Sequence, residues 1–281
     1  MVGGSTQATT MMTGDLVLGV NIDHVATLRQ ARYAGMPGAP NEEPSLLAAA
    51  QECEASGAHG ITIHLRADRR HIQDRDVWEL REKIHTRMNL EMGDTPEILR
   101  IALKVKPHSV CLVPENRQEI TTEGGLDVAG LTGGSRRGTG LWETIARLRD
   151  AGIRVSLFID PDPRQVAASA ETGAEMVELH TGAYANADVT GGDSELTGLI
   201  AAARQARAAG LQVNAGHGIT LSNLVKLMRV PHLRELNVGH HLVSRALFGG
   251  FGAAVREMLR LMEVYPTLQA AYHQEAGLSD T

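Results

Sequence analysis

The sequence predicts an α/β chain folded as a closed (β/α)8 barrel, the TIM-barrel architecture, with a parallel eight-stranded barrel and extra loop or helical segments. Eight short apolar runs recur along the 281 residues, and stretches of helical periodicity separate them. The runs are largely aliphatic, which is typical of parallel strands buried on both faces. Eight strand–helix units in about 250 residues match the size of one such barrel. An open doubly wound sheet is the alternative, but no GxGxxG follows the first run.

The predicted strands follow one another at regular spacing, and each is bounded by turn-forming or polar residues. In chain order they are residues 16–23 (LVLGVNID), 60–65 (GITIHL), 87–92 (RMNLEM), 109–114 (SVCLVP), 154–160 (RVSLFID), 176–182 (MVELHTG), 211–218 (LQVNAGHG) and 235–240 (ELNVGH). Because helices separate consecutive strands, neighbouring strands are predicted to be parallel.

Amphipathic periodicity predicts helices between these strands, among them residues 45–58, 75–84, 96–106, 141–152 and 164–174. Several helical stretches end on a glycine just before the next strand, namely Gly57, Gly152, Gly173 and Gly210. A glycine there suits the left-handed conformation that commonly terminates a helix.

A single barrel domain is predicted for residues 16–265, followed by a C-terminal tail at 266–281. Residues 1–15 lack the cationic start and apolar middle of a signal peptide, so we expect a disordered extension, with Met11 or Met12 as an alternative start. Residues 33–45 are rich in Pro and Gly and predict an irregular loop. Residues 115–140 form an unusually long connection, either a lid hinged at its glycine pairs or flexible padding.

Composition excludes several classes of partner. The formal charge is 27 − 33 = −6 and no basic cluster stands out, which argues against nucleic acid. No apolar run approaches the roughly 20 residues that span a bilayer, so no membrane association is expected. Cys53 and Cys111 both lie in apolar patterns, which favours core packing in a reducing, cytoplasmic compartment.

Polar side chains gather at the carboxyl ends of six of the predicted strands. In a (β/α)8 barrel these ends surround the active site, so the set predicts a catalytic pocket. Its members are Asn21, Asp23, His24, His64, Arg66, His71, Glu91, Glu178, His180, Asn214, His217, Asn237 and His240.

Two groups of residues in this ring suit phosphate. Gly216, Gly218 and Gly239 let the backbone approach an anion after the last two strands, where this fold commonly binds phosphate. The second group is cationic or hydroxylic, although a surface salt-bridge cluster is an equally simple reading of its arginines; it comprises Arg66, Arg69, Arg70, His71, Thr121 and Thr122. Two anion sites predict one bisphosphate or two phosphorylated substrates.

Metal and lysine chemistry are not expected. No carboxylate–histidine set has a familiar ligand spacing, so we predict neither a metal site nor another cofactor. The only lysines, Lys83, Lys104, Lys106 and Lys226, fall in helices or just before strands. If an imine forms, its amine is therefore expected to come from a substrate.

The motifs GVNIDHVATLRQAR, GITIHLRADRRHIQDRD, RMNLEM, LVPENRQEITTEGGLDV, VSLFIDPD, ELHTGAYA, VNAGHGIT and ELNVGH resemble the pyridoxine 5′-phosphate synthase (PdxJ) family, from about Leu16 to Met262. The resemblance implies condensation of 3-amino-2-oxopropyl phosphate with 1-deoxy-D-xylulose 5-phosphate in vitamin B6 biosynthesis. The implied products are pyridoxine 5′-phosphate, phosphate and water.

The resemblance also assigns roles to residues of this chain. It makes His64 and Glu91 proton acceptors and His217 a proton donor. It implies a site for the aminoketone phosphate at Asn21, Arg32, Gly218, Gly239 and His240. It implies a site for the deoxyxylulose phosphate at Asp23, His24, Arg66, His71 and Thr121. Glu178 matches a further carboxylate of the family pocket, in a role that the resemblance does not define.

The chain departs from the family pattern at its periphery, in the 1–15 extension, the expanded 33–45 loop, the Gly-rich 131–140 segment and His241. The family implies a homo-octamer, which the sequence itself does not specify. Two other functions stay open on the residues alone. A sugar-phosphate isomerase or aldolase would need only one phosphate site, and a non-catalytic barrel would need no acid/base ring.

Overall fold

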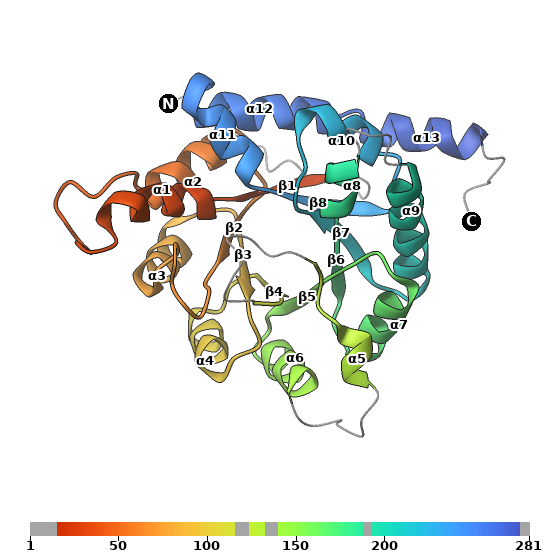
Figure 1. The fold of residues 1–281 in the computed structure, drawn as a ribbon, viewed down its shortest axis with the longest axis horizontal. Coiled ribbons are helices and arrows are strands. Elements are labelled where there is room, and N and C mark those ends of the chain that lie inside the picture. The colour runs from red at the N-terminus through yellow and green to blue at the C-terminus, as the bar shows by residue number, and fades with distance from the viewer. Residues whose placement is uncertain (1–15, 116–123, 133–139, 188–192, 276–281) are drawn as a thin grey trace, which may run out of the picture.

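The eight predicted strands form a closed, all-parallel barrel in the computed structural model, which describes residues 16–115, 124–132, 140–187 and 193–275 (Figure 1). Consecutive strands pair, and β8 returns to pair with β1. The strands are β1 (Val17–Asn21), β2 (Gly60–His64), β3 (Arg87–Met92), β4 (Ser109–Leu112), β5 (Arg154–Ile159), β6 (Met176–His180), β7 (Gln212–Gly216) and β8 (Leu233–Val238). The predicted fold class is confirmed.

Helices surround the barrel (Figure 1). They are α1 (Asp23–Tyr33), α2 (Leu46–Ala55), α3 (Asp74–Lys83), α4 (Pro96–Val105), α5 (Val128–Thr132), α6 (Leu141–Asp150), α7 (Pro163–Glu171), α8 (Gly182–Ala187), α9 (Asp193–Ala208), α10 (Leu221–Leu227), α11 (His240–Gly249), α12 (Phe251–Met262) and α13 (Tyr265–Glu275). None of the described helices is long and apolar enough to cross a membrane.

Side-chain caps fix where several helices begin. The Ser45 hydroxyl accepts a hydrogen bond from Ala48 N–H, and the Thr95 hydroxyl accepts one from Ile98 N–H. Such caps satisfy backbone donors that the first turn leaves without a helical partner. The glycines predicted to end helices, Gly57, Gly152, Gly173 and Gly210, all have positive φ.

The aliphatic residues of the strands pack outward against the helices in one large core that includes Leu18, Ile61, Leu90 and Leu236. The interior of the barrel is polar instead. Asn237 of β8 bonds Thr62 of β2 across β1, and it donates to Glu178 of β6 across β7. A Cβ on Gly19 of β1 would lie 2.2 Å from the Asn237 amide oxygen, so glycine there leaves room for this network. Burial on both faces is therefore correct, but one face is hydrogen-bonded rather than apolar.

Three segments differ from the predicted pattern or lie beyond it. The segment interpreted as a tail from residue 266 continues as α13 through Glu275. Part of the long 115–140 connection forms the short helix α5, and residues 116–123 and 133–139 lie outside the described residues. The extension predicted at 1–15 also lies outside them.

Candidate active site

The carboxyl ends of the strands surround a cavity of about 660 Å³. Its lining comes from the ends of all eight strands and from the segments that follow them. Thirteen residues that the sequence assigned to a site line it together: Asn21, Asp23, His24, His64, Arg66, His71, Glu91, Glu178, His217, Gly218, Asn237, Gly239 and His240. Chain topology thus gathers side chains that are up to 219 residues apart (240 − 21) around one mouth.

Several predicted site residues are not among those that line the cavity, namely Arg32, Thr121, His180, Asn214 and Gly216. Arg32 lies exposed in the last turn of α1, with its guanidinium 5.8 Å from the Tyr33 ring. Thr121 falls outside the described residues. Arg69 and Arg70 also lie away from the lining, because Arg69 pairs with Asp74 and Glu97 while Arg70 pairs with Asp68. These two arginines form a salt-bridge cluster rather than an anion site.

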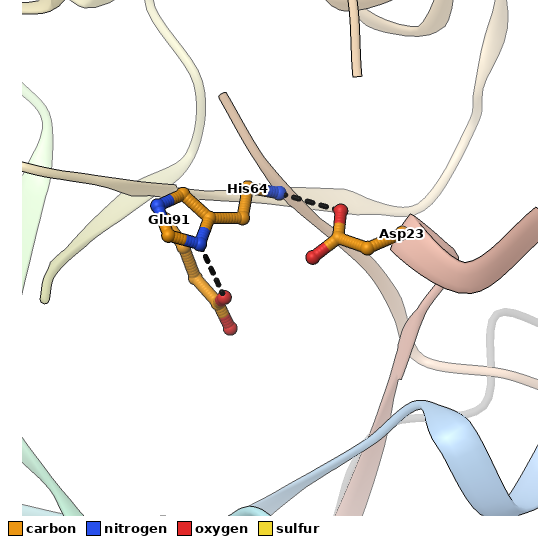
Figure 2. Close-up of side chains that lie close together, drawn as sticks. All are labelled: Asp23, His64 and Glu91. Atoms are coloured by element: carbon orange, nitrogen blue, oxygen red, sulfur yellow. Dashed lines mark hydrogen bonds and ion pairs between the residues drawn. The ribbon is translucent and has the colours of Figure 1, made fainter. Parts of the chain in front are cut away.

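The Asp23 carboxylate is held by two hydrogen-bond donors at the start of α1. The Asn21 side-chain amide donates to its Oδ2 at 2.9 Å, and His64 N–H donates to its Oδ1 at 2.8 Å. In return, Asp23 N–H donates to the Asn21 Oδ1. The polar run after β1 therefore connects the end of β1 to the end of β2, and it orients a carboxylate in the pocket (Figure 2).

His64 and Glu91 extend from the adjacent strands β2 and β3, where they are paired in register. The His64 Nδ1 lies 3.9 Å from the Glu91 Oε2, and Figure 2 shows the ring turned toward that carboxylate. The opposite ring nitrogen, Nε2, lies 2.9 Å from the Oε1 of Glu115. The His64 ring is thus flanked by two carboxylates, one in the pocket and one behind it.

The pocket disfavours charge on its buried carboxylates. Burial, followed by the nearby Asp23 and Glu178, raises the pKa of Glu91 well above its usual value. Burial also raises the pKa of Glu178, with Glu235 adding to the shift and hydrogen bonds from Asn237 and Cys111 opposing it. Carboxyl groups with such raised pKa values are suited to exchange protons near neutral pH.

His180 and His24 lie near His217, and His24 in turn contacts His240. Burial, then His180 and His24, lower the pKa of His217 to about 4. The His180 ring lies edge-on to His217 at 5.0 Å, and its Nδ1 is 2.9 Å from Asp160. His24 and His240 approach within 2.8 Å through their Nδ1 atoms. Burial and the neighbouring histidines therefore keep His217 neutral at pH 7.

Arg29 supports the pocket from outside. It is buried, and its guanidinium donates to both carboxylate oxygens of Asp76, at 2.8 and 2.7 Å. The same guanidinium donates to the His71 carbonyl at 3.2 Å. Arg29 therefore ties α1 to α3 and fixes the backbone of a residue that lines the cavity.

Asp23, His64 and Glu91 are the one group of described residues that offers three ligand atoms for a metal ion, all within 4.8 Å of one another. Two of these groups already have other partners, since Asp23 accepts from His64 N–H and His64 contacts Glu115. The cluster could take a divalent cation only in competition with those contacts.

Two functional candidates were not identified from the sequence. Glu115 begins the long connection after β4, and Asp160 follows β5; both contact histidines of the site, although neither lines the cavity. The signal for Asp160 was its place at the end of a strand. Glu115 offered the same signal, because it directly follows the predicted strand at 109–114, but the path of the connection that it begins is not defined by periodicity.

Comparison with known proteins identifies relatives along nearly the whole chain. A family model described as "Pyridoxal phosphate biosynthesis protein PdxJ" matches residues 18–264. A pyridoxine 5′-phosphate synthase of Akkermansia muciniphila is 53% identical over 249 residues, which cover 88% of this chain and 99% of that protein. A pyridoxine 5′-phosphate synthase of a Synechococcus species is 54% identical over 248 residues, covering 88% and 98%.

Solved structures that resemble this one share its architecture. Thiamine phosphate pyrophosphorylase from Pyrococcus furiosus superposes with a TM-score of 0.56 at 14% identity, covering 89% of this chain and 96% of that one. Phosphoribosyl anthranilate isomerase from Thermus thermophilus gives a TM-score of 0.53 at 15% identity, covering 88% and 98%. At these identities the likeness shows the fold alone.

Proposed function

Because the chain belongs to the family of the pyridoxal phosphate biosynthesis protein PdxJ and is an enzyme of vitamin B6 biosynthesis, we propose that it condenses 3-amino-2-oxopropyl phosphate with 1-deoxy-D-xylulose 5-phosphate. The products are pyridoxine 5′-phosphate, phosphate and water. The observation that carries the proposal is the set of proton-exchanging side chains around one cavity, with His64 and Glu91 on one side and His217 on the other.

The reaction requires several positioned acids and bases. The substrate amine adds to the deoxyxylulose ketone and loses water to give an imine, which must tautomerise, eliminate one phosphate and close to the ring with the net loss of a second water. Protons move on or off carbon and oxygen at each of these stages. In the proposed mechanism His64 and Glu91 accept protons and His217 donates one. Glu178 is a further carboxyl group in reach of the same cavity.

Phosphate binding prepares His217 for its role. A donor must be protonated, whereas burial and the neighbouring histidines lower the pKa of His217 to about 4. Two phosphate dianions in the cavity would favour the charged imidazolium and raise the pKa of His217 again. His217 then becomes an acid only when substrates are bound.

The two phosphates are proposed to bind on different sides of the cavity. The aminoketone phosphate takes Gly218, Gly239 and His240, where Gly239 precedes the N-terminus of α11 and free N–H groups favour an anion. Asn21 and Arg32 complete this proposed site. The deoxyxylulose phosphate takes Asp23, His24, Arg66, His71 and Thr121. A cytoplasmic location, expected from the two cysteines in apolar patterns, and a homo-octamer, which the resemblance implies, belong to the same proposal.

The test is to incubate the protein with both substrates and to follow pyridoxine 5′-phosphate by its absorbance and phosphate by release. We expect both products in equal amounts, and neither from either substrate alone. Conversion of a single sugar phosphate to an isomer or to cleavage products would instead establish the isomerase or aldolase alternative. No turnover of any of these substrates would contradict the proposal.

A further inference from the structure

Glu115 lies behind the His64 ring, at the point where the chain leaves β4 for the long connection. Its side chain is 13% exposed and makes three hydrogen bonds, two to the end of β2 and one to the end of β3. The Oε1 contacts the His64 Nε2 at 2.9 Å and accepts from Gly93 N–H at 3.1 Å. The Oε2 accepts from Ala67 N–H at 3.1 Å. The carboxylate thus joins the ends of β2, β3 and β4.

The backbone at Gly93 leaves a space that this carboxylate fills. A Cβ built on Gly93 would lie 2.9 Å from the Glu115 Cδ and 3.1 Å from its Cγ. A side chain at position 93 would therefore displace Glu115 from the His64 ring. The space at Gly93 is evidence independent of the hydrogen bonds, and it indicates that the backbone is shaped to hold the Glu115 carboxylate beside His64.

The donors around Glu115 determine the tautomer of His64. An ionised carboxylate only accepts hydrogen bonds, so the His64 Nε2 in contact with it must carry the proton. Burial alone would raise the pKa of Glu115, but the hydrogen bonds from His64 and Ala67 outweigh it and hold the pKa below its usual value, which keeps the group ionised. The lone pair of neutral His64 is then on Nδ1, which faces the cavity 3.9 Å from Glu91.

We propose that Glu115 is a positioning residue for proton transfer, which fixes His64 in the tautomer whose Nδ1 is the base. The inference rests on the proposed function, in which His64 accepts a proton. Glu91 does not set the tautomer, because its 3.9 Å separation from Nδ1 is longer than a hydrogen bond. His71 approaches the ring only at 6.1 Å between centroids, and Asp23 accepts from the His64 backbone rather than from the ring.

The decisive variant is Glu115→Gln. Gly93 N–H and Ala67 N–H use different oxygens, so a single amide oxygen serves only one of them, and the glutamine presents either its oxygen or its NH₂ to His64. Because His64 is then no longer fixed in one tautomer, we expect kcat to fall severalfold or more while KM changes within a few-fold, since the phosphate contacts stay intact. Glu115→Asp keeps the charge and should retain more activity than the glutamine variant.

The tautomer is read directly from ¹⁵N NMR of histidine-labelled protein, with His64→Ala used to assign the His64 signals. Wild type should show a protonated Nε2 and an unprotonated Nδ1, and Glu115→Gln should lose this single tautomer and show protonated Nδ1 as well. A matched control is Glu54→Gln, because Glu54 also accepts from two backbone N–H groups, those of His85 and Thr86, far from the cavity. That control should leave kcat and the His64 signals unchanged.

Two results would overturn the inference. One is a wild-type His64 that carries its proton on Nδ1, and the other is a Glu115→Gln effect on kcat that persists in the His64→Ala background, which would indicate a structural role. Failure of the proposed function is a distinct outcome. If His64→Ala made pyridoxine 5′-phosphate at the wild-type rate, His64 would lose its role as base, while the NMR signals would still decide whether Glu115 fixes the ring.

Discussion

Glu91 gives the most direct test of the acid/base ring at the scale of single residues. Glu91→Gln keeps the side-chain shape but removes the base, so kcat should fall about 10²- to 10⁴-fold with phosphate binding retained. Wild-type activity should also rise with pH through the raised pKa of Glu91, since only the ionised form accepts a proton. The measurement is a pH profile of kcat/KM for both proteins. Turnover within a few-fold of wild type would exclude Glu91 from the mechanism.

No metal requirement is expected, although Asp23, His64 and Glu91 lie close together. A cation bound there would compete with the hydrogen bond between His64 N–H and Asp23 and with the orientation of the His64 ring. We therefore predict full activity after exhaustive treatment with a chelator, measured against a sample supplied with Mg²⁺, Mn²⁺ or Zn²⁺. Loss of activity that one of these ions restores would assign the cluster as a metal site.

Which residues meet in the pocket could be predicted from the sequence, because a parallel barrel sends the carboxyl ends of all its strands to one mouth. This argument identified thirteen of the cavity-lining residues. It did not identify partners that act through another side chain. Glu115 contacts His64 from a connection 51 positions further along the chain, and Arg69 is recruited by carboxylates that lie outside the pocket. Such pairings depend on the path of a loop, which no periodicity encodes.

At the scale of elements, α1 and α3 are joined by the buried Arg29–Asp76 pair. Arg29→Met would leave the Asp76 carboxylate buried and without its cation, which typically destabilises a protein by about 3–5 kcal/mol. Adding Asp76→Asn removes that stranded charge while keeping an acceptor for Gln73 N–H, so the double variant should recover part of the loss. Thermal and urea unfolding of the three proteins measure this.

The exposed pair on the same helix provides the control for this prediction. Lys83 and Glu79 pair at 2.8 Å with about half of each side chain exposed, so Lys83→Met should leave the unfolding midpoint unchanged. Equal destabilisation by Lys83→Met and Arg29→Met would show that burial of the Arg29 pair contributes nothing.

Strand positions could be predicted to within a few residues, because aliphatic runs and the glycines after helices mark them. The polar interior was missed for a physical reason. The alternation is visible in GITIH and MVELH, but Thr62 and Glu178 are as buried as their aliphatic neighbours. They are buried because hydrogen bonds across the barrel satisfy them, and those bonds join residues far apart in sequence.

For the whole molecule, the polar interior makes stability depend on pH. Burial raises the pKa of Glu178 from 4.5 to about 8, so the folded protein holds a proton there that the unfolded chain releases. The free energy of unfolding that this group contributes is fully present below pH 4.5 and is lost as the pH rises from there through about 8. The loss is of the order of a few kcal/mol.

Glu178→Gln removes this ionisation while keeping the shape of the side chain. The wild-type protein should therefore lose stability relative to the variant between pH 5 and pH 8, as measured by their unfolding midpoints across that range. A difference that stays constant with pH would show that Glu178 ionises in the folded state much as it does in the unfolded chain.

The arrangement of the whole barrel also decides where the imine forms. Lys83 ends α3, Lys104 lies in α4, Lys106 follows α4, and Lys226 lies in α10, where it pairs with Asp193 at 3.2 Å. All four lie among the described residues, and none lines the cavity. A protein Schiff base needs an amine at the reacting carbon, so the amine must belong to 3-amino-2-oxopropyl phosphate and the carbonyl to the deoxyxylulose phosphate.

Borohydride added during turnover should therefore reduce an imine between the two substrates. We expect a small-molecule secondary amine in the filtrate and an unchanged mass for the intact chain, both measured by mass spectrometry. A sample without 3-amino-2-oxopropyl phosphate is the control, and it should give no such adduct, because borohydride would find only a free ketone to reduce to an alcohol. A stable mass increase mapped to any of the four lysines would exclude this mechanism, because the imine would then have formed with a lysine amine of the protein, as in an aldolase.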